Sequence, residues 1–244
     1  MDRQHKLQLV SAILQMPPKL PSAFMRVQQC EFENRYNVCE LLRESYEKNR
    51  DIVKLFRSST PVVTVCLNVS GSANIGIIVR NADAFGGSEV HVLGRKFFDG
   101  RSVVGCNNRV SVKKSNAGYQ VSVTNENKVQ IDKNAHEFVD YLDNIADGHI
   151  IPVFVEQASL KFVGRQVPLS EIHEKLKVAQ FGESNSTIVV IVGSESHGIP
   201  QEFIEASLQK FNDAFVTWIP QQGLVRSLNV AVAHSIVMQK LNER

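Results

Sequence analysis

Apolar and polar positions along the middle of the chain predict strands and helices in turn. Residues 62–69 form a continuous apolar run, as expected for a strand in the buried centre of a parallel sheet. A polar loop follows, and then a helical pattern over 75–85 that Gly86 and Gly87 are expected to close. The next apolar run, 89–93, completes a β-α-β unit. We therefore predict an α/β fold with a mainly parallel sheet.

The same alternation continues towards the C terminus. The remaining predicted elements are helices over 137–145, 169–177 and 201–210 and strands over 150–155, 187–192 and 214–219. The last strand leads through a Pro-Gln-Gln-Gly turn into a final helix. We expect this helix to begin at Ser227, because a serine hydroxyl can accept a hydrogen bond from a free backbone N–H group there. Its uncharged positions at helical spacing predict a buried helix: Leu228, Ala231, Val232, Ser235, Ile236 and Leu241.

Two segments do not follow this alternation. The first is an N-terminal extension over 1–58, which precedes a main domain over 59–244. Prolines break the extension early, and an amphipathic helical pattern follows over 32–56. We favour a helix that packs on the main domain. An RNA-contacting arm is the alternative, which the interspersed glutamates weaken.

Periodicity also fades over 94–135, which predicts a surface insertion. Short alternating runs at 120–123 and 129–131 indicate two small strands within it, and its lysines and arginines make it more basic than its surroundings. A solvated loop is the favoured interpretation, and contact with a substrate is the alternative.

Composition limits the class of protein more than it indicates a function. The chain has 244 residues, 43% of them hydrophobic and 21% charged, which is typical of a globular protein with a sizeable core. A net charge of +2 means that any surface for nucleic acid must be local. No apolar run approaches the ~20 residues of a membrane span, so we expect no membrane partner.

The four cysteines bear on compartment and on metal binding. They are Cys30, Cys39, Cys66 and Cys106, and they contain no C-x-x-C pair and no paired Cys/His spacing. We therefore expect reduced thiols, no metal site and an intracellular protein. The cytoplasm is the favoured compartment over the mitochondrion or the nucleus, since the weakly amphipathic start carries an acid at Asp2 and little arginine.

Three apolar strands each end in a polar loop that carries candidate chemistry. The loops cover 74–80, 193–198 and 220–229. Because the carboxyl ends of parallel strands share one edge of a sheet, we expect the three loops to converge. None matches a dinucleotide or Walker phosphate fingerprint, which argues against an ordinary nicotinamide or Rossmann-type site.

The three loops, taken together, resemble the motifs of a known enzyme family. The run Asn-Ile-Gly-Ile-Ile-Val-Arg-Asn-Ala-Asp-Ala-Phe-Gly from Asn74 resembles motif one of the SpoU/TrmH family of RNA ribose 2′-O-methyltransferases, N-x-G-x-x-x-R-x-A-x-x-F-G. Residues 192–199 resemble motif two, and the stretch from Ile219 to Val230 resembles motif three. The likeness covers about 62–241. Ile-Pro-Gln-Gln-Gly-Leu-Val-Arg-Ser-Leu-Asn-Val is especially similar to the eukaryotic tRNA guanosine methyltransferases of this family.

This resemblance implies a fold, a cofactor and an assembly. It implies a SPOUT fold, in which the C-terminal segment of the α/β sheet forms a deep trefoil knot, and a homodimer that acts on RNA. S-adenosylmethionine would bind in the knot and leave as S-adenosylhomocysteine. The residues implied for cofactor binding are Val192, Gly193, Glu195, Gly198, Ile219, Pro220, Gly223, Ser227 and Leu228.

The resemblance also implies a catalytic set. Its members would be Asn74, Arg80, Glu195, Ser227 and Asn229. Methyl transfer to a ribose hydroxyl requires in-line positioning, removal of a proton and stabilisation of the developing oxyanion. Arg80 suits the third task and contact with a phosphate, since a guanidinium donates several hydrogen bonds and is a poor base.

The sequence departs from the family pattern at two positions, and its N-terminal extension and basic insertion match no family motif, which keeps the choice of RNA open. Arg226 stands where many bacterial relatives carry an acid, and Ala231 where many carry serine. We therefore expect an S-adenosylmethionine-dependent RNA (ribose-2′-O)-methyltransferase, with tRNA favoured over rRNA and room for an accessory protein. A catalytically inactive SPOUT-like RNA-binding or assembly subunit, for example in ribosome maturation, is the alternative.

Overall fold

In a computed structural model of the chain, the described residues are 60–94, 100–103, 106, 109–123, 129–179 and 185–243. They belong to one compact unit within residues 58–244. The helical extension predicted for 1–58 lies outside the described residues.

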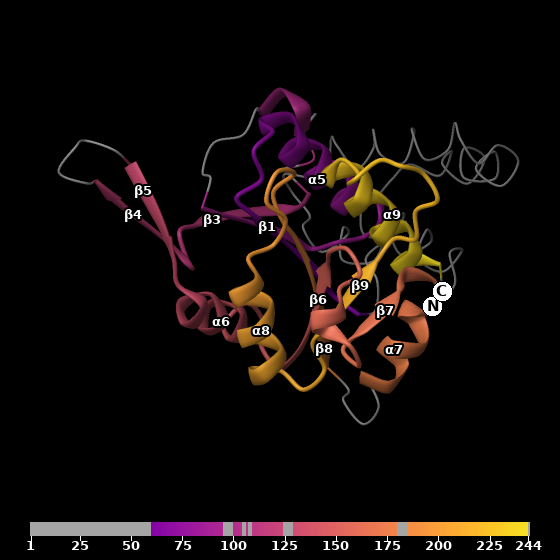
Figure 1. The fold of residues 1–244 in the computed structure, drawn as a ribbon. Helices are drawn as coiled ribbons and strands as arrows, with labels where there is room; N and C mark the ends of the chain where they lie inside the picture. The colour runs from indigo at the N-terminus through magenta and orange to yellow at the C-terminus, as the bar shows by residue number, and fades with distance from the viewer. Residues whose placement is uncertain are drawn as a thin grey trace, which may run out of the picture. The chain divides into compact units, whose positions relative to one another are not determined.

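One sheet organises the described part of the chain (Figure 1). Its seven strands lie in the order β3-β2-β1-β8-β6-β9-β7, and every neighbouring pair is parallel. The strands are β1 (Val62–Leu67), β2 (Glu89–Leu93), β3 (Ser111–Ser115), β6 (His149–Val155), β7 (Gln166–Pro168), β8 (Ser186–Val192) and β9 (Phe215–Trp218). The predicted α/β fold with a mainly parallel sheet is confirmed. The threading that a knot requires stays a prediction.

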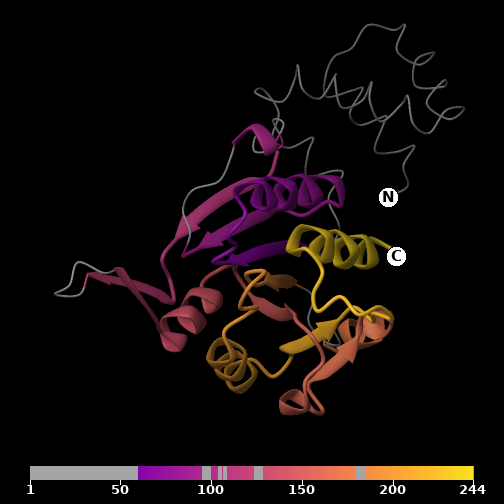
Figure 2. The same cartoon turned by 45° about the horizontal axis from the view of Figure 1, so that its top comes forward.

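Helices cover both faces of the sheet, since alternate side chains of each buried strand point to opposite faces. Val62 and Cys66 of β1 join the core under α5 (Ser72–Ala84), α7 (Ile172–Ala179) and α9 (Val230–Asn242). Val63 and Val65 join the core under α6 (Ala135–Asp143) and α8 (Gln201–Lys210). Figure 2 shows α5 and α9 side by side on their face. No helix in the described part of the chain is both long and apolar enough to cross a membrane.

The final helix differs from its prediction at its start. It begins at Val230, and Asn229 is its cap: Asn229 Oδ1 accepts hydrogen bonds from the backbone N–H groups of Ala231 at 2.9 Å and Val232 at 3.3 Å. Asparagine and serine cap helices about equally well, so the residue types did not distinguish Asn229 from Ser227, which lies in the preceding loop.

The buried face of α9 also differs from the prediction. Val232 is 48% exposed and Ile236 36% exposed. The buried side of the helix carries Val230, Ala231, His234, Val237, Met238 and Leu241. Two apolar side chains expected in the core therefore lie on the surface.

Part of the predicted insertion over 94–135 belongs to the sheet. β3 is a parallel edge strand beside β2, and its sequence Ser-Val-Lys-Lys-Ser is too polar to be recognised from hydrophobicity alone. The two short predicted strands are an antiparallel hairpin, β4 (Tyr119–Val123) and β5 (Val129–Lys133), which projects from the sheet in Figure 1. β7 was not predicted, because three residues ending in proline show no periodicity.

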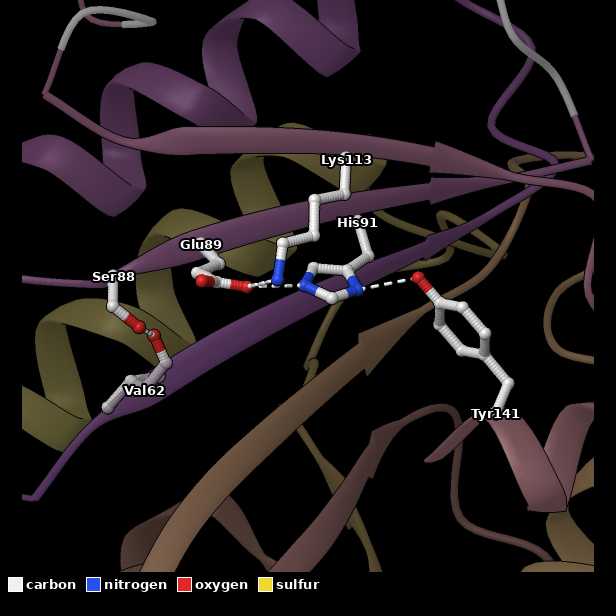
Figure 3. Close-up of polar contacts among 6 residues, drawn as sticks. All are labelled: Val62, Ser88, Glu89, His91, Lys113 and Tyr141. Carbon is white, nitrogen blue, oxygen red and sulfur yellow. Dashed lines mark hydrogen bonds and ion pairs between the residues drawn. The ribbon is translucent and has the colours of Figure 1, made fainter. Parts of the chain in front are cut away.

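A polar cluster fixes the β2–β3 edge to α6 (Figure 3). Glu89 Oε2 lies 2.7 Å from Lys113 Nζ and 2.8 Å from His91 Nε2, and His91 Nδ1 lies 2.7 Å from the Tyr141 hydroxyl. Burial lowers the pKa of His91. Because the neutral ring must donate from Nε2 to the carboxylate, Nδ1 accepts the Tyr141 hydroxyl proton. Every member of the cluster is thus hydrogen-bonded, as a stable structural network requires.

Candidate active site

The three motif loops meet at the carboxyl edge of the sheet. Asn74 lies in the first turn of α5 after β1, Glu195 follows β8, and Asn229 caps α9 after β9. Asn74 Nδ2 donates to Glu195 Oε1, and Asn229 Nδ2 donates to Asn74 Oδ1 at 3.2 Å. These contacts join residues more than 120 positions apart in the sequence. The predicted convergence of the loops is confirmed.

Glu195 is the centre of this network. Its Oε2 accepts hydrogen bonds from the hydroxyl of Ser70 at 2.7 Å and from the backbone N–H of Ser70 at 3.3 Å. Partial burial acts to raise the pKa of Glu195, but the hydrogen bonds from Ser70 and Asn74 outweigh it and lower the pKa below its usual value. Glu195 is therefore an ionised acceptor that holds the amide of Asn74 in one orientation.

Two glycines allow the loop after β8 to fold tightly. Ser194 and Gly198 pair with each other through backbone hydrogen bonds of 3.2 and 2.8 Å. A Cβ at Gly193 would lie 2.3–2.5 Å from backbone atoms of Gly198 and Ile199, which cannot move as a side chain could. Gly198 has a φ of +65°, in the left-handed region that favours glycine.

A cavity of about 680 Å³ lies beside this loop. Its walls come from the loops after β6, β8 and β9 and from the first turns of α9. Seven of the residues predicted to bind a cofactor line it: Val192, Gly193, Glu195, Gly198, Ile219, Ser227 and Leu228. Pro220 and Gly223 are not among the lining residues. A cavity of this size holds a ligand as large as a nucleoside derivative.

The loop after β6 contributes cavity residues that the sequence motifs missed. Glu156 Oε2 accepts a hydrogen bond from the backbone N–H of Ile199 at 2.9 Å, and Gln157 Nε2 donates to the carbonyl of Arg226. Glu156, Gln157 and Ala158 of this loop line the cavity, and so does Trp218 at the end of β9. The available signal was that the apolar strand over 150–155 also ends in polar residues at the same sheet edge. Glu156 and Glu195 both line the cavity, and two carboxylates there suit a cationic ligand.

The remaining two predicted catalytic residues, Ser227 and Arg80, do not join this network. Ser227 is exposed on the cavity wall. Arg80 lies six residues beyond Asn74 on α5 and is exposed. Within the described part of the chain, no hydrogen bond or ion pair joins it to Glu195, Asn74 or Asn229. The structure thus brings three of the five predicted catalytic residues into one network.

Two histidines near the site have different environments. His234 lies on the buried side of α9, with Nε2 3.0 Å from the Thr64 hydroxyl, and burial lowers its pKa to about 3. A neutral, buried histidine of this kind is structural. His197 is exposed on the cavity wall, where its Nδ1 lies 2.7 Å from the Ser196 hydroxyl. Among the described residues, no group of three His, Cys, Asp or Glu side chains could hold a metal ion.

Comparison with known proteins identifies a family and a fold. A family model described as the SpoU rRNA Methylase family matches residues 61–239. No curated protein matches the sequence significantly. A probable methylase family protein from Haemophilus influenzae Rd KW20 is similar in structure, with a TM-score of 0.54 and 20% identity over 76% of this chain and 66% of its own. The A. aeolicus TrmH/SpoU tRNA modifying enzyme has a TM-score of 0.52 and 18% identity over 83% of each chain.

A third solved structure gives the same result. The probable methyltransferase from Bordetella pertussis Tohama I has a TM-score of 0.52 and 13% identity over 75% of this chain and 95% of its own. At these identities the likeness establishes the fold. The chain spans just under two thirds of the length of the Haemophilus protein. It spans 58% and 60% of the length of two other similar solved chains.

Proposed function

Because this chain belongs to the SpoU rRNA methylase family, we propose that it transfers a methyl group from S-adenosylmethionine to a ribose 2′-hydroxyl of structured RNA. The observation that carries this proposal is the position of the Asn74–Glu195–Asn229 network beside the cavity. We favour tRNA over rRNA as the substrate, because the run from Ile219 to Val230 is similar to the tRNA group of the family.

The cavity suits the cofactor in size and in charge. S-adenosylmethionine would supply an electrophilic methyl group on a sulfonium and leave as S-adenosylhomocysteine. The carboxylates of Glu156 and Glu195 would balance the positive charges of such a ligand, while Ile219, Leu228 and Trp218 offer apolar contact. The close packing of Gly193 against the backbone of Gly198 and Ile199 would hold the loop after β8 in place as one wall of the cavity.

The network next to the cavity is suited to holding a ribose. Asn74 and Asn229 present amide groups whose orientation is set by their mutual hydrogen bond and by the ionised Glu195. Ser227, in the loop at the mouth of α9, adds a hydroxyl. Arg80 would contact a phosphate and stabilise the developing charge on the 2′-oxygen, since a guanidinium donates to two oxygens at once. Arg226 would add a second phosphate contact.

A homodimer is part of the proposal. Ile77 of α5 and Val232 and Ile236 of α9 are exposed apolar side chains on two helices that pack side by side. Leu224 and Val225, in the loop before α9, are exposed as well. Exposed apolar groups gathered on neighbouring elements are typical of a protein–protein interface. We infer that a second copy of the chain covers them.

Calorimetry with S-adenosylhomocysteine, followed by a methylation assay, tests the proposal. We expect the wild-type protein to bind the compound and to methylate RNA. We expect Arg80→Ala to bind the compound equally well and to lose methylation, because Arg80 lies outside the cavity. Undiminished methylation by Arg80→Ala would exclude its catalytic role. Absence of binding by the wild-type protein would favour the RNA-binding scaffold instead.

A further inference from the structure

One face of α5 carries Arg80 between two residues that contact the segment after β2. Gly76, Arg80 and Asp83 are spaced by four and then three residues, so they share a helix face. The short helix η1 (Gly100–Val103) packs directly on this face. A Cβ at Gly76 would lie 1.7 Å from the Ser102 hydroxyl oxygen and 3.0 Å from the Ser102 backbone. Glycine is therefore required where the segment crosses the helix.

The second contact of this face is an ion pair at Asp83. Arg109 Nε lies 2.9 and 3.0 Å from the two carboxylate oxygens of Asp83, and Arg109 Nη2 lies 2.7 Å from Oδ2. The two side chains are only 20% and 21% exposed. Arg109 Nη2 also donates to Cys106 Sγ at 3.4 Å. The guanidinium thus engages both oxygens of the carboxylate, a geometry that a single ammonium could not reproduce.

Without the ion pair to Arg109, the carboxylate of Asp83 would have another partner close by. Arg80 precedes Asp83 by three residues, and oppositely charged residues at that spacing on a helix form an ion pair. In the described part of the chain, Arg80 makes no ion pair and is exposed. Burial raises the pKa of the Cys106 thiol, and the positive charges of Arg109 and Arg80 oppose this rise, which puts Arg80 within electrostatic range of the cluster.

We propose that Arg109 is a positioning residue, which holds the Asp83 carboxylate so that Arg80 stays available for an RNA phosphate. A carboxylate paired with Arg80 would compete with the phosphate for the same N–H donors. The inference rests on the proposed role of Arg80 in binding RNA. It adds that Arg109, which lies outside the three sequence motifs, controls through its ion pair with Asp83 of motif one whether Arg80 can perform that role.

Steady-state kinetics with RNA at saturating S-adenosylmethionine tests this proposal. Arg109→Ala is expected to lower kcat/KM for RNA about two- to fivefold, because Asp83 would then form a surface ion pair with Arg80. The affinity for S-adenosylhomocysteine is expected to stay unchanged. Asp83→Asn alone is expected to stay near wild type. The double variant Asp83→Asn/Arg109→Ala is expected to recover wild-type kcat/KM, because the competing carboxylate is gone. Arg109→Gln removes the same charge and is the second variant if alanine prevents folding.

Two results would overturn the proposal. One is an unchanged kcat/KM in both Arg109 variants. The other is a double variant as impaired as Arg109→Ala, which would mean that Arg109 only anchors the segment to α5.

A second measurement does not depend on activity. A double-mutant cycle of Arg80→Ala and Asp83→Asn, read by thermal unfolding, gives the coupling between the two side chains. We expect no coupling when Arg109 is present and a favourable coupling in the Arg109→Ala or Arg109→Gln background. Absence of coupling in those backgrounds would refute the proposal. If the wild-type chain methylates no RNA, the proposed function fails while this cycle still decides whether Arg109 keeps Asp83 from Arg80.

Discussion

Glu195 holds together side chains from all three motif loops. It accepts hydrogen bonds from Ser70 and Asn74, and Asn74 in turn accepts one from Asn229. A glutamine in its place would present an N–H₂ group to donors and leave one of them unpaired, at a cost of about 1–3 kcal/mol. The network would lose its fixed geometry.

We therefore predict that Glu195→Gln lowers the rate of RNA methylation at least tenfold. Methyl transfer from isotopically labelled S-adenosylmethionine to RNA is the measurement. Glu205→Gln is the matched control, because Glu205 is an exposed residue of α8 whose hydrogen bond is with Gln201 of the same helix. Equal rates for the two variants would remove Glu195 from the mechanism.

His234 makes the stability of the fold depend on pH. Burial lowers its pKa in the folded protein to about 3, whereas an unfolded histidine titrates near pH ~6.5. Below that pH the unfolded chain binds a proton that the folded chain does not, so the free energy of unfolding falls as pH decreases. The contribution is fully present above pH ~6.5 and is lost progressively between that pH and about 3.

Urea unfolding of the wild-type protein and of His234→Gln between pH 7 and pH 4 is the test. The wild type is expected to lose up to about 1.4 kcal/mol more per pH unit than the variant. His136→Gln, at an exposed position of α6, is the control and should keep the wild-type slope. A His234→Gln slope equal to that of the wild type would contradict a buried neutral histidine.

At the scale of elements, two of the three glycines predicted to bind the cofactor have opposite surroundings. A Cβ at Gly193 meets the backbone of Gly198 and Ile199, whereas a Cβ at Gly223 meets no atom within 4 Å. We predict that Gly193→Ala destabilises the protein by about 1–3 kcal/mol, as overpacking of a rigid site does. It should also weaken binding of S-adenosylhomocysteine at least tenfold.

Gly223→Ala serves as the matched control for this pair. We expect it to keep wild-type affinity and thermal stability, measured by calorimetry and by thermal unfolding. If Gly193→Ala binds as tightly as Gly223→Ala, the loop after β8 does not form the cofactor wall.

Elements with strong patterns were predictable from the sequence, and those with mixed patterns were not. β2 and α8 have the predicted bounds, because apolar runs and helical spacing were continuous there. β3 is an edge strand made mostly of serine and lysine, so its place beside β2 depends on pairing that hydrophobicity does not report. The cap of α9 was misplaced by two residues, from Asn229 to Ser227, since two residues of equal capping strength stood close together.

The candidate site was predictable as a set of loops but not as a set of contacts. Parallel strands share an edge, so the meeting of Asn74, Glu195 and Asn229 followed from the fold class. The contribution of Glu156 did not follow, because its loop matches no motif. The clamp of Arg109 on Asp83 could not be predicted either, since it depends on how the segment after β2 crosses α5.

At the scale of the whole molecule, the exposed apolar surface of α5 and α9 predicts a dimer. We expect Val232→Glu to convert the wild-type dimer into a monomer in sedimentation analysis, because an unpaired charge would be buried in the interface. Val178→Glu is the control: Val178 is also an exposed valine, but it lies on α7. A monomeric wild-type protein, or a Val232→Glu dimer, would contradict the proposed interface.

Identification of the methylated product is the decisive measurement for the proposed ribose methylation. Purified protein is incubated with S-adenosylmethionine and unmodified tRNA or rRNA, the RNA is digested to nucleosides, and these are analysed by mass spectrometry. We predict a 2′-O-methylated nucleoside with the wild-type protein and none with Arg80→Ala, although both are expected to bind S-adenosylhomocysteine. A methyl group on a base would contradict this prediction. So would a wild-type protein that neither binds the cofactor nor yields a methylated product.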